Sequence, residues 1–394
     1  MIIEKLKEVQ GIDKYGEKLP DWTEELKYEF VDEIMGDKLR EAEEWINQLY
    51  KILEELREKL KIRGWLFSRE MKSFLDDPKR HLVKKLFLYF HDLARGRIDA
   101  NEFVSKGSQA IKSSFGSNMR SIYQSWGLAA ILVELSERGY RLVYPEHGYL
   151  DFDRSGKQKS GIIPPNAVVE DLFGNSLSFF MEAPRPISWE DGTDLERVWK
   201  LYSLVRPDML IYKGFVMNIV ELENQEIPIK RPNYVVEFKE LDNWWKRWRY
   251  LKGYKPLSGN EWRARWLKGL YEGLADILGV KPSDLPQFEE SKGKRIREYK
   301  VIELYKAIYK PDKGVVISRV PVDDNVKADL GEGIIFTDGV YFYREKLSEV
   351  IDDLTKNMSR NVDIKDLAYK FAIENKTLFL EWLKSKGITI QGGL

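Results

Sequence analysis

The sequence predicts an α/β protein: a mixed β-sheet with interspersed helices, preceded by an all-helical region. Apolar residues between Asp37 and Ile62 recur in alternating steps of three and four, which is typical of a long helix. Later in the chain, short apolar runs bounded by Gly, Pro and Asp are typical of strands; they lie at 140–145, 206–212, 234–239 and 314–320. Helical patterns lie between several of these runs, so we expect helices to cover the sheet.

Composition limits the class of protein and of chemistry. A chain of 394 residues with 43% hydrophobic residues has enough apolar side chains for two or three globular domains. Cysteine is absent, which excludes disulfides, thiolate zinc sites and cysteine nucleophiles. The 64 basic and 64 acidic residues cancel, so an argument for nucleic-acid binding must rest on local patches. The high content of Lys, Glu and Arg favours a thermophilic prokaryote as the source. The charged start and the lack of a long apolar run favour a soluble cytoplasmic protein.

The first third of the chain is expected to be helical. The heptad pattern at 37–62 has either another chain or a neighbouring helix as its partner, and amphipathic segments at 68–75 and 81–93 favour an intramolecular bundle. The serines and glycine of 113–118 predict the end of this region. The expected organisation is therefore a helical bundle domain at 1–118, an α/β domain at 119–350 and a C-terminal helical segment at 351–394.

The second region begins with a predicted helix, Met119 to Arg138, which stops at Gly139 and leads into the strand at 140–145. Glu134 lies near the end of this helix, and it is either a solvated residue or a carboxylate aimed at the same end of the sheet as Asp208. The elements expected further on are a strand at 177–181, a helix at 193–204, a helix at 261–278, a strand at 314–320, a hairpin at 333–342 with an Asp-Gly turn, and helices at 345–358 and 364–384.

The stretch that carries chemistry combines Arg206-Pro207-Asp208 with the apolar strand that ends in Glu237-Phe238-Lys239. Side chains alternate along a strand, so Glu237 and Lys239 share one face and Phe238 points to the other. A buried carboxylate costs several kcal/mol unless it is paired or bound to a cation. Two interpretations remain open: an ion pair on an edge strand, or the metal site of a phosphodiesterase.

A window rich in tryptophan and basic residues follows. Residues 242–273 hold five of the chain's twelve tryptophans. Core packing explains some of them, but basic and aromatic residues in alternation also suit a groove that follows phosphates and stacks bases. The candidate nucleic-acid contacts are Lys246, Arg247, Arg249, Lys252, Arg263 and Arg265, and a second basic cluster at 292–300 opens the next predicted helix.

Pro207-Asp208 and Glu237-Phe238-Lys239 resemble the motif of the PD-(D/E)xK nuclease superfamily, and the likeness extends over roughly 119–342. The resemblance implies a restriction-endonuclease-like core and an Mg²⁺-dependent endonuclease acting on DNA, with Mn²⁺ able to substitute, and a restriction or defence role. In such a site Asp208, Glu237 and the Phe238 carbonyl would bind the metal, and Lys239 would orient the attacking water and stabilise developing charge. Glu134 would hold a second metal or its water, and Arg206 would contact phosphate.

Several alternatives stay open. Glu221 and Glu223 end the strand nearest to Asp208 in sequence, so they form a rival metal set without the lysine. The protein could instead be an inactive nucleic-acid-binding or scaffold protein, or a nuclease for RNA, single strands or branched DNA. A homodimer is compatible with each of these functions. The three histidines lack metal-ligand spacing, and no Walker-type phosphate loop is present.

Overall fold

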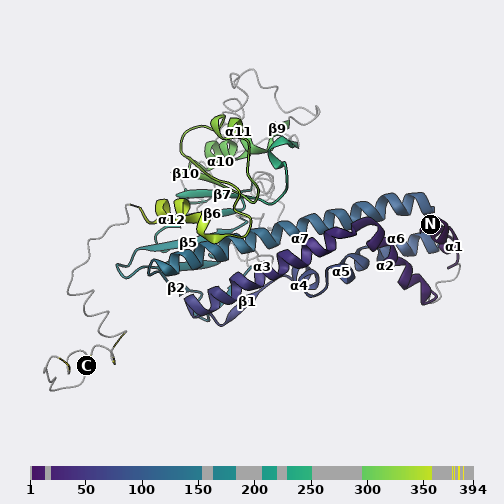
Figure 1. Cartoon of the computed structure of the whole chain (residues 1–394), viewed down its shortest axis with the longest axis horizontal. Coiled ribbons are helices and arrows are strands. Elements are labelled where there is room, and N and C mark those ends of the chain that lie inside the picture. Colours follow the sequence, from purple (N-terminus) through teal and green to yellow (C-terminus); the bar gives the residue numbers. More distant parts are fainter. Residues whose placement is uncertain are drawn as a thin grey trace, which may run out of the picture.

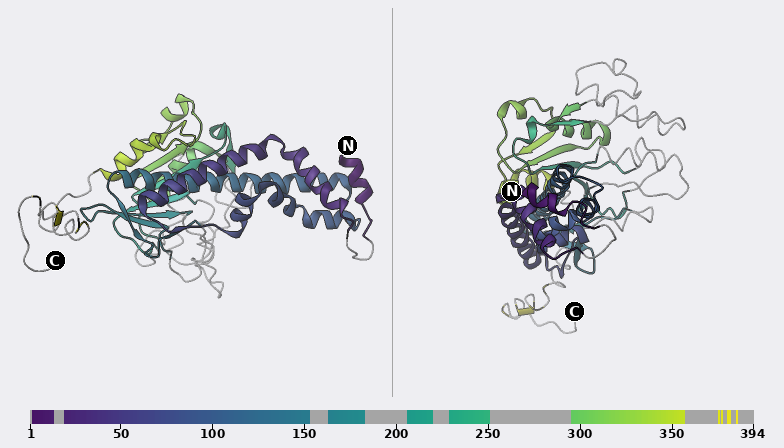
Figure 2. Two further views of the ribbon diagram at one scale, coloured as in Figure 1. Left: turned by 60° about the horizontal axis from the view of Figure 1, so that its bottom comes forward. Right: turned by 90° about the vertical axis from the view of Figure 1, so that its right-hand side faces the viewer.

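The computed structural model describes residues 2–13, 19–152, 163–182, 206–219, 229–250 and 295–356, and five isolated positions between 375 and 385. An elongated arm of helices lies beside and beneath a mixed β-sheet, and the N-terminus lies at the far end of the arm (Figure 1). Figure 2 shows that the long helices of the arm continue along the sheet rather than ending before it. Among the described residues, no helix has the length and apolarity needed to span a bilayer.

The arm is built from seven helices that enclose a continuous apolar core. The predicted heptad helix is confirmed as α3, and its buried side chains, including Ile46, Leu49 and Leu53, pack along α7 within the same chain. Ser68 and Asp77 cap α4 and α5 by accepting hydrogen bonds from backbone N–H groups, as short polar N-cap residues do. The bounds are α1 (Ile2–Val9), α2 (Trp22–Met35), α3 (Asp37–Leu60), α4 (Arg69–Asp76), α5 (Pro78–Lys85), α6 (Phe87–Ala94) and α7 (Ala100–Glu137).

The helix break predicted at 113–118 is wrong, because α7 runs without interruption for 38 residues. Gly107 allows close packing: a Cβ there would lie 3.1 Å from the Leu86 side chain. Asn118 donates its side-chain N–H to the backbone carbonyl of Ser114, so this polar side chain bonds within the helix instead of ending it. The domain division at 118 stays a prediction, but the break that suggested it does not exist.

Within the described residues, the sheet has seven strands in the order β11-β10-β7-β6-β5-β4-β2. β7, β10 and β11 run parallel to one another, and the remaining neighbours are antiparallel. The strands are β2 (Arg141–Tyr144), β4 (Ala167–Glu170), β5 (Ser176–Met181), β6 (Met209–Lys213), β7 (Tyr234–Lys239), β10 (Lys313–Ser318) and β11 (Ile334–Thr337). Two small ribbons accompany it: β1 (Gly64–Leu66) with β3 (Tyr149–Asp151), and β8 (Trp248–Tyr250) with β9 (Arg295–Arg297).

The two faces of the sheet are covered differently. Val236 and Phe238 of β7 face α7 and belong to the core that continues into the arm, whereas Val235 faces α10 (Val301–Tyr309). The predicted alternation is thus confirmed. Gly127 lets α7 approach β7 closely, since a Cβ at that position would lie 2.1 Å from the Phe238 ring.

The predicted hairpin at 333–342 is wrong. β11 pairs parallel with β10, and the chain does not fold back as a second strand after Gly339. Instead, the Phe342 ring packs against the rings of Trp45, Tyr123 and Trp126, which gains more apolar contact than a ribbon at the sheet edge. The remaining elements are η2 (Trp244–Lys246), η4 (Glu298–Lys300), α11 (Asp324–Ala328), η5 (Arg344–Leu347) and α12 (Ser348–Thr355).

The remaining predicted helices either lie outside the described residues or differ from the structure. The helices expected at 193–204 and 261–278 lie outside the described residues, and so does nearly all of the one at 364–384. The basic cluster at 292–300 was expected to open a helix, but its described part forms β9 and η4 before α10 begins at Val301.

Candidate active site

The two halves of the charged motif meet at one end of the sheet. Met209 pairs with Val236 across antiparallel β6 and β7, so Asp208, one residue before β6, reaches the end of β7. The Asp208 carboxylate accepts a hydrogen bond from the Phe238 backbone N–H at 2.8 Å and one from the Gln124 side-chain amide at 2.7 Å. Strand register and one side chain of α7 therefore fix the position of this carboxylate.

Lys239 lies between two carboxylates. Its Nζ is 2.7 Å from Glu237 Oε1 and 2.6 Å from Glu298 Oε1. It also lies 5.4 Å from the centre of the Trp244 ring. Arg249 Nε is 3.6 Å from the second oxygen of Glu298, so four charged side chains form one network in which Glu237 and Lys239 are buried.

The network determines the charge states. Burial tends to lower the pKa of Lys239, but Glu237 and Glu298 outweigh it and raise this pKa, so Lys239 stays an ammonium ion. For Glu298, burial acts to raise the pKa, and the nearby charges of Lys239 and Arg249 overcome it and lower this pKa. Asp208 differs: burial and the nearby Glu237 charge raise its pKa well above the usual range. The positive groups near Asp208 therefore do not offset the cost of burying its ionised carboxylate beside Glu237.

The donor atoms fit a hard cation. Glu237 Oε2 is buried and has no hydrogen-bond partner among the described residues, although burying such an oxygen unpaired costs about 1–3 kcal/mol or more. Asp208 and Glu237 supply two carboxylates at this site. Within the described part of the chain, no cluster of three or more His, Cys, Asp or Glu residues is arranged to hold a metal. Mg²⁺ needs only one or two protein carboxylates when water and phosphate complete its shell.

A cavity of about 340 Å³ opens above these groups. Arg120 of α7 and the exposed Arg247 contribute positive charge to its wall. Trp248, also in the wall, is 43% exposed, and the Arg297 guanidinium lies 4.1 Å from the centre of its ring. The lining residues are Arg120, Asp208, Glu237, Phe238, Lys239, Glu240, Leu241, Trp244, Arg247, Trp248, Arg249 and Glu298.

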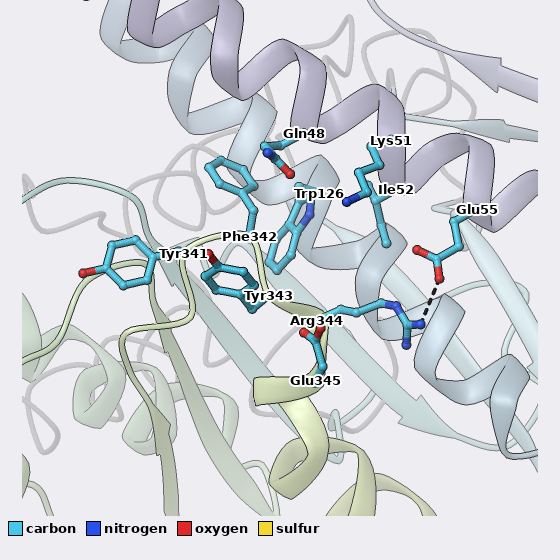
Figure 3. Close-up of a pocket in the computed structure, with 10 residues that line it drawn as sticks. All are labelled: Gln48, Lys51, Ile52, Glu55, Trp126, Tyr341, Phe342, Tyr343, Arg344 and Glu345. Atoms are coloured by element: carbon cyan, nitrogen blue, oxygen red, sulfur yellow. Dashed lines mark ion pairs between the residues drawn. The ribbon is translucent and has the colours of Figure 1, made fainter.

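Glu134 is not part of this cavity. It follows Gln124 by about 15 Å along α7, and its carboxylate pairs with Arg344 instead. Arg344 also pairs with Glu55 and Glu137, and it lines a different cavity of about 500 Å³ between α3 and the chain after β11 (Figure 3). The interpretation of Glu134 as a carboxylate aimed at the end of the sheet with Asp208 is therefore wrong.

The predicted basic contacts divide into three groups. Arg247 and Arg249 line the cavity. Arg206, which is 3.4 Å from Glu182, and Lys246, which lies over the Trp245 ring, do not line it. Lys252, Arg263, Arg265 and the rival acids Glu221 and Glu223 lie outside the described residues.

Two of the three described tryptophans in the aromatic window are core residues. Trp244 and Trp245 are buried, and their indole N–H groups donate to Ser318 and Asp323 respectively. Trp248, by contrast, has an exposed ring at the cavity wall. Core packing therefore explains the first two, whereas Trp248 lies at the cavity wall with Arg297 over its ring.

Sequence reasoning missed four polar residues at the site, three in the cavity wall and Gln124 behind Asp208. Arg120 and Gln124 are four positions apart, hence on one face of α7, but nothing in their spacing indicated that the face meets Asp208. Glu240 directly follows the Glu237-Phe238-Lys239 motif, so its sequence position could have identified it as part of the site. Its carboxylate lies 3.5 Å from Arg120. Glu298 lies 59 positions after Lys239, and no local pattern connects the two.

Comparisons of this chain with protein-family models, with curated proteins and with solved structures find no match.

Proposed function

We propose that this protein is an Mg²⁺-dependent nuclease of the PD-(D/E)xK type that hydrolyses DNA phosphodiester bonds. The observation that carries the proposal is the junction of Asp208 with the Glu237-Phe238-Lys239 strand end, held by the Phe238 N–H, beside the unpartnered oxygen of Glu237. The element order supports it: α7, the antiparallel strands β5, β6 and β7, then α10 and β10 parallel to β7. An endonuclease role in restriction or defence follows from analogy of fold.

The chain's residues have distinct tasks in this chemistry. Asp208 and Glu237, with the Phe238 carbonyl, would hold Mg²⁺, which neutralises charge on the phosphate and supplies hydroxide near neutral pH. Lys239 keeps its ammonium charge and can orient the attacking water or stabilise the charge that develops on phosphate oxygens. Glu298 would still hold Lys239 if Glu237 bound the cation, because it contacts the same ammonium at 2.6 Å. Arg120 and Arg247 would contact the neighbouring phosphates.

The test is cleavage of supercoiled plasmid, linear duplex and single-stranded DNA with Mg²⁺, with Mn²⁺ and with chelator. We expect metal-dependent cleavage that Asp208→Asn and Lys239→Ala abolish. Glu134→Gln is the matched control, because this acid lies on α7 but outside the cavity, and it should leave cleavage unchanged. If Lys239→Ala cleaves normally while Glu221→Gln and Glu223→Gln do not, the assigned metal set is wrong.

A second candidate, an inactive nucleic-acid-binding protein, is favoured by one feature: Lys239 is already neutralised by two carboxylates. Mg²⁺ binding separates the two candidates. If the site binds Mg²⁺, adding Mg²⁺ will raise the midpoint temperature of thermal unfolding, and Asp208→Asn will remove that rise. An inactive ion-pair network will show no metal-dependent rise in either protein.

A further inference from the structure

The catalytic cavity continues into a second one. This second cavity has a volume of about 590 Å³ and shares Arg120, Glu240, Leu241 and Arg247 with the first. From there it extends between α7 and the start of α3, where Lys112 and Lys38 line it. The two cavities therefore form one groove that leads from Asp208 and Glu237 to the helical arm; we call it the α3–α7 groove.

The accessible charge of this groove is mainly positive. Lys38, Lys112 and Arg247 are exposed and form no ion pair with any described residue. Of the acidic groups on the same wall, Glu240 faces Arg120 at 3.5 Å and Asp242 pairs with Arg319. Glu41 is the remaining acid there. In the second cavity, three cations without an ion pair to any described residue thus face one such acid, which favours an anionic ligand there.

The spacing suits a backbone with repeated charges. Lys112 and Arg120 are separated by about 12 Å along the α7 axis, so they would contact different phosphates of one strand. Cations set along a groove are how proteins follow a nucleic-acid backbone without reading its bases.

The depth of the site favours an unpaired strand. The side chain of Glu237 is only 4% exposed, so a phosphate must enter the cavity to reach it. Bases of a continuous duplex are paired and stacked, and the second strand would have to follow the first into the same cavity. A single strand, in contrast, can enter the cavity alone.

We propose that the α3–α7 groove binds a single-stranded segment of nucleic acid, with phosphates at Arg247, Lys112 and Lys38, and leads it to Asp208 and Glu237. The substrate class is therefore a single strand or a duplex with an unpaired tail, and a blunt duplex is a poor substrate. The substrate part of this inference rests on the proposed nuclease function. The helical arm then contributes directly to substrate binding through α3 and α7.

The experiment measures binding by the full chain in chelator, by fluorescence anisotropy. The probes are a labelled 15-nucleotide single strand, the blunt duplex of the same sequence, and that duplex with an unpaired tail. We expect the single strand and the tailed duplex to bind at least tenfold more tightly than the blunt duplex. Lys38→Glu and Lys112→Glu should each weaken single-strand binding, and Lys112→Ala should lower the slope of log affinity against log salt by about 0.7.

Lys51→Glu is the control, because Lys51 is also an exposed lysine of α3 but lines the cavity of Figure 3. It should bind the single strand as the unchanged protein does. Equal affinity for blunt duplex and single strand, or unchanged binding by both groove variants, would overturn the inference. Binding as expected without cleavage by any metal would refute the nuclease alone, whereas metal-dependent cleavage of blunt duplex at full rate by the groove variants would refute the groove alone.

Discussion

At the scale of single residues, the site is organised by the sharing of Lys239 between Glu237 and Glu298. Strand alternation was enough to predict that Glu237 and Lys239 share a face. Glu298 could not be predicted, because it reaches Lys239 only through the packing of η4 beside η2, far away in sequence. In the proposed nuclease, Glu298 would keep the ammonium in place when Glu237 binds a cation.

Glu298→Gln therefore tests whether Lys239 needs this second carboxylate. Gln preserves the shape but removes the charge, so we expect the cleavage rate at saturating substrate to fall about 10- to 100-fold, as for other residues that orient a ligand from outside the reacting atoms. The Michaelis constant should change little, and Glu298→Asp should recover part of the rate. Glu303→Gln, which removes a nearby partner of Lys300 outside the cavity, is the control. An unchanged rate in Glu298→Gln would show that Lys239 is positioned by Glu237 alone.

At the scale of elements, α7 joins the arm to the sheet and places Arg120 and Gln124 at the site. The sequence predicted that the helical region ends at 113–118 and that a new helix begins at Met119, because serine and glycine are normally helix breakers. In the structure, Asn118 bonds to the Ser114 carbonyl within α7, and Gly107 allows close packing against Leu86. Such use depends on the neighbouring helices, and a local pattern does not contain that information.

Gly127→Ala tests the close contact between α7 and β7. The added methyl group would overlap the buried Phe238 ring, so we expect a loss of about 1–3 kcal/mol in unfolding free energy by denaturant titration. Gly116→Ala is the matched control on the same helix, since its Cβ meets nothing within 4 Å. It should raise the unfolding free energy by about 0.8–1 kcal/mol through helix propensity alone. Equal effects of the two changes would show that α7 can shift away from β7 freely.

His81 makes the arm sensitive to pH. Its ring is 3% exposed, lies 3.1 Å from Ser114 Oγ and 3.4 Å from Glu70 Oε1, and is near Lys84 and Lys85. Burial and the Lys85 charge lower its pKa, although Glu70 opposes them. The folded state therefore binds this proton less readily than the unfolded chain, and stability falls as pH drops below the unfolded pKa of about 6.5.

Between pH 7.5 and pH 5 we expect the unfolding free energy to decrease by at most about 1.4 kcal/mol per pH unit from this group. His81→Gln should flatten that slope, whatever it does to stability at pH 7.5. Denaturant titrations at intervals of half a pH unit measure it. Asp208, whose pKa is raised, titrates alike in both proteins, so the difference between their slopes reports His81. A slope identical in both proteins would assign the pH dependence to other groups.

At the scale of the whole molecule, the class of fold could be predicted because each element carries its own apolar period. The strand runs, the heptad of α3 and the Glu237–Lys239 alternation are all local. The position of Glu134 was mispredicted because its carboxylate pairs with Arg344, which lies 210 positions later in the chain. The order of the seven strands likewise depends on contacts between distant segments, such as β10 beside β7.

The continuous core predicts that arm and sheet unfold together. Residues from Leu26 in α2 to Leu354 in α12 belong to one apolar cluster, and Trp45 and Trp126 lie in it where the arm meets the sheet. Thermal unfolding followed by far-ultraviolet circular dichroism and by tryptophan fluorescence should therefore give coincident transitions. A fragment that begins at residue 119 would cut α7 and remove α3, exposing Trp126 and the α7 side facing it, so it should lose cooperative unfolding. If that fragment instead melts cooperatively at the midpoint of the full chain, the division at 118 is a true domain boundary and the arm is an appendage to an independent catalytic domain.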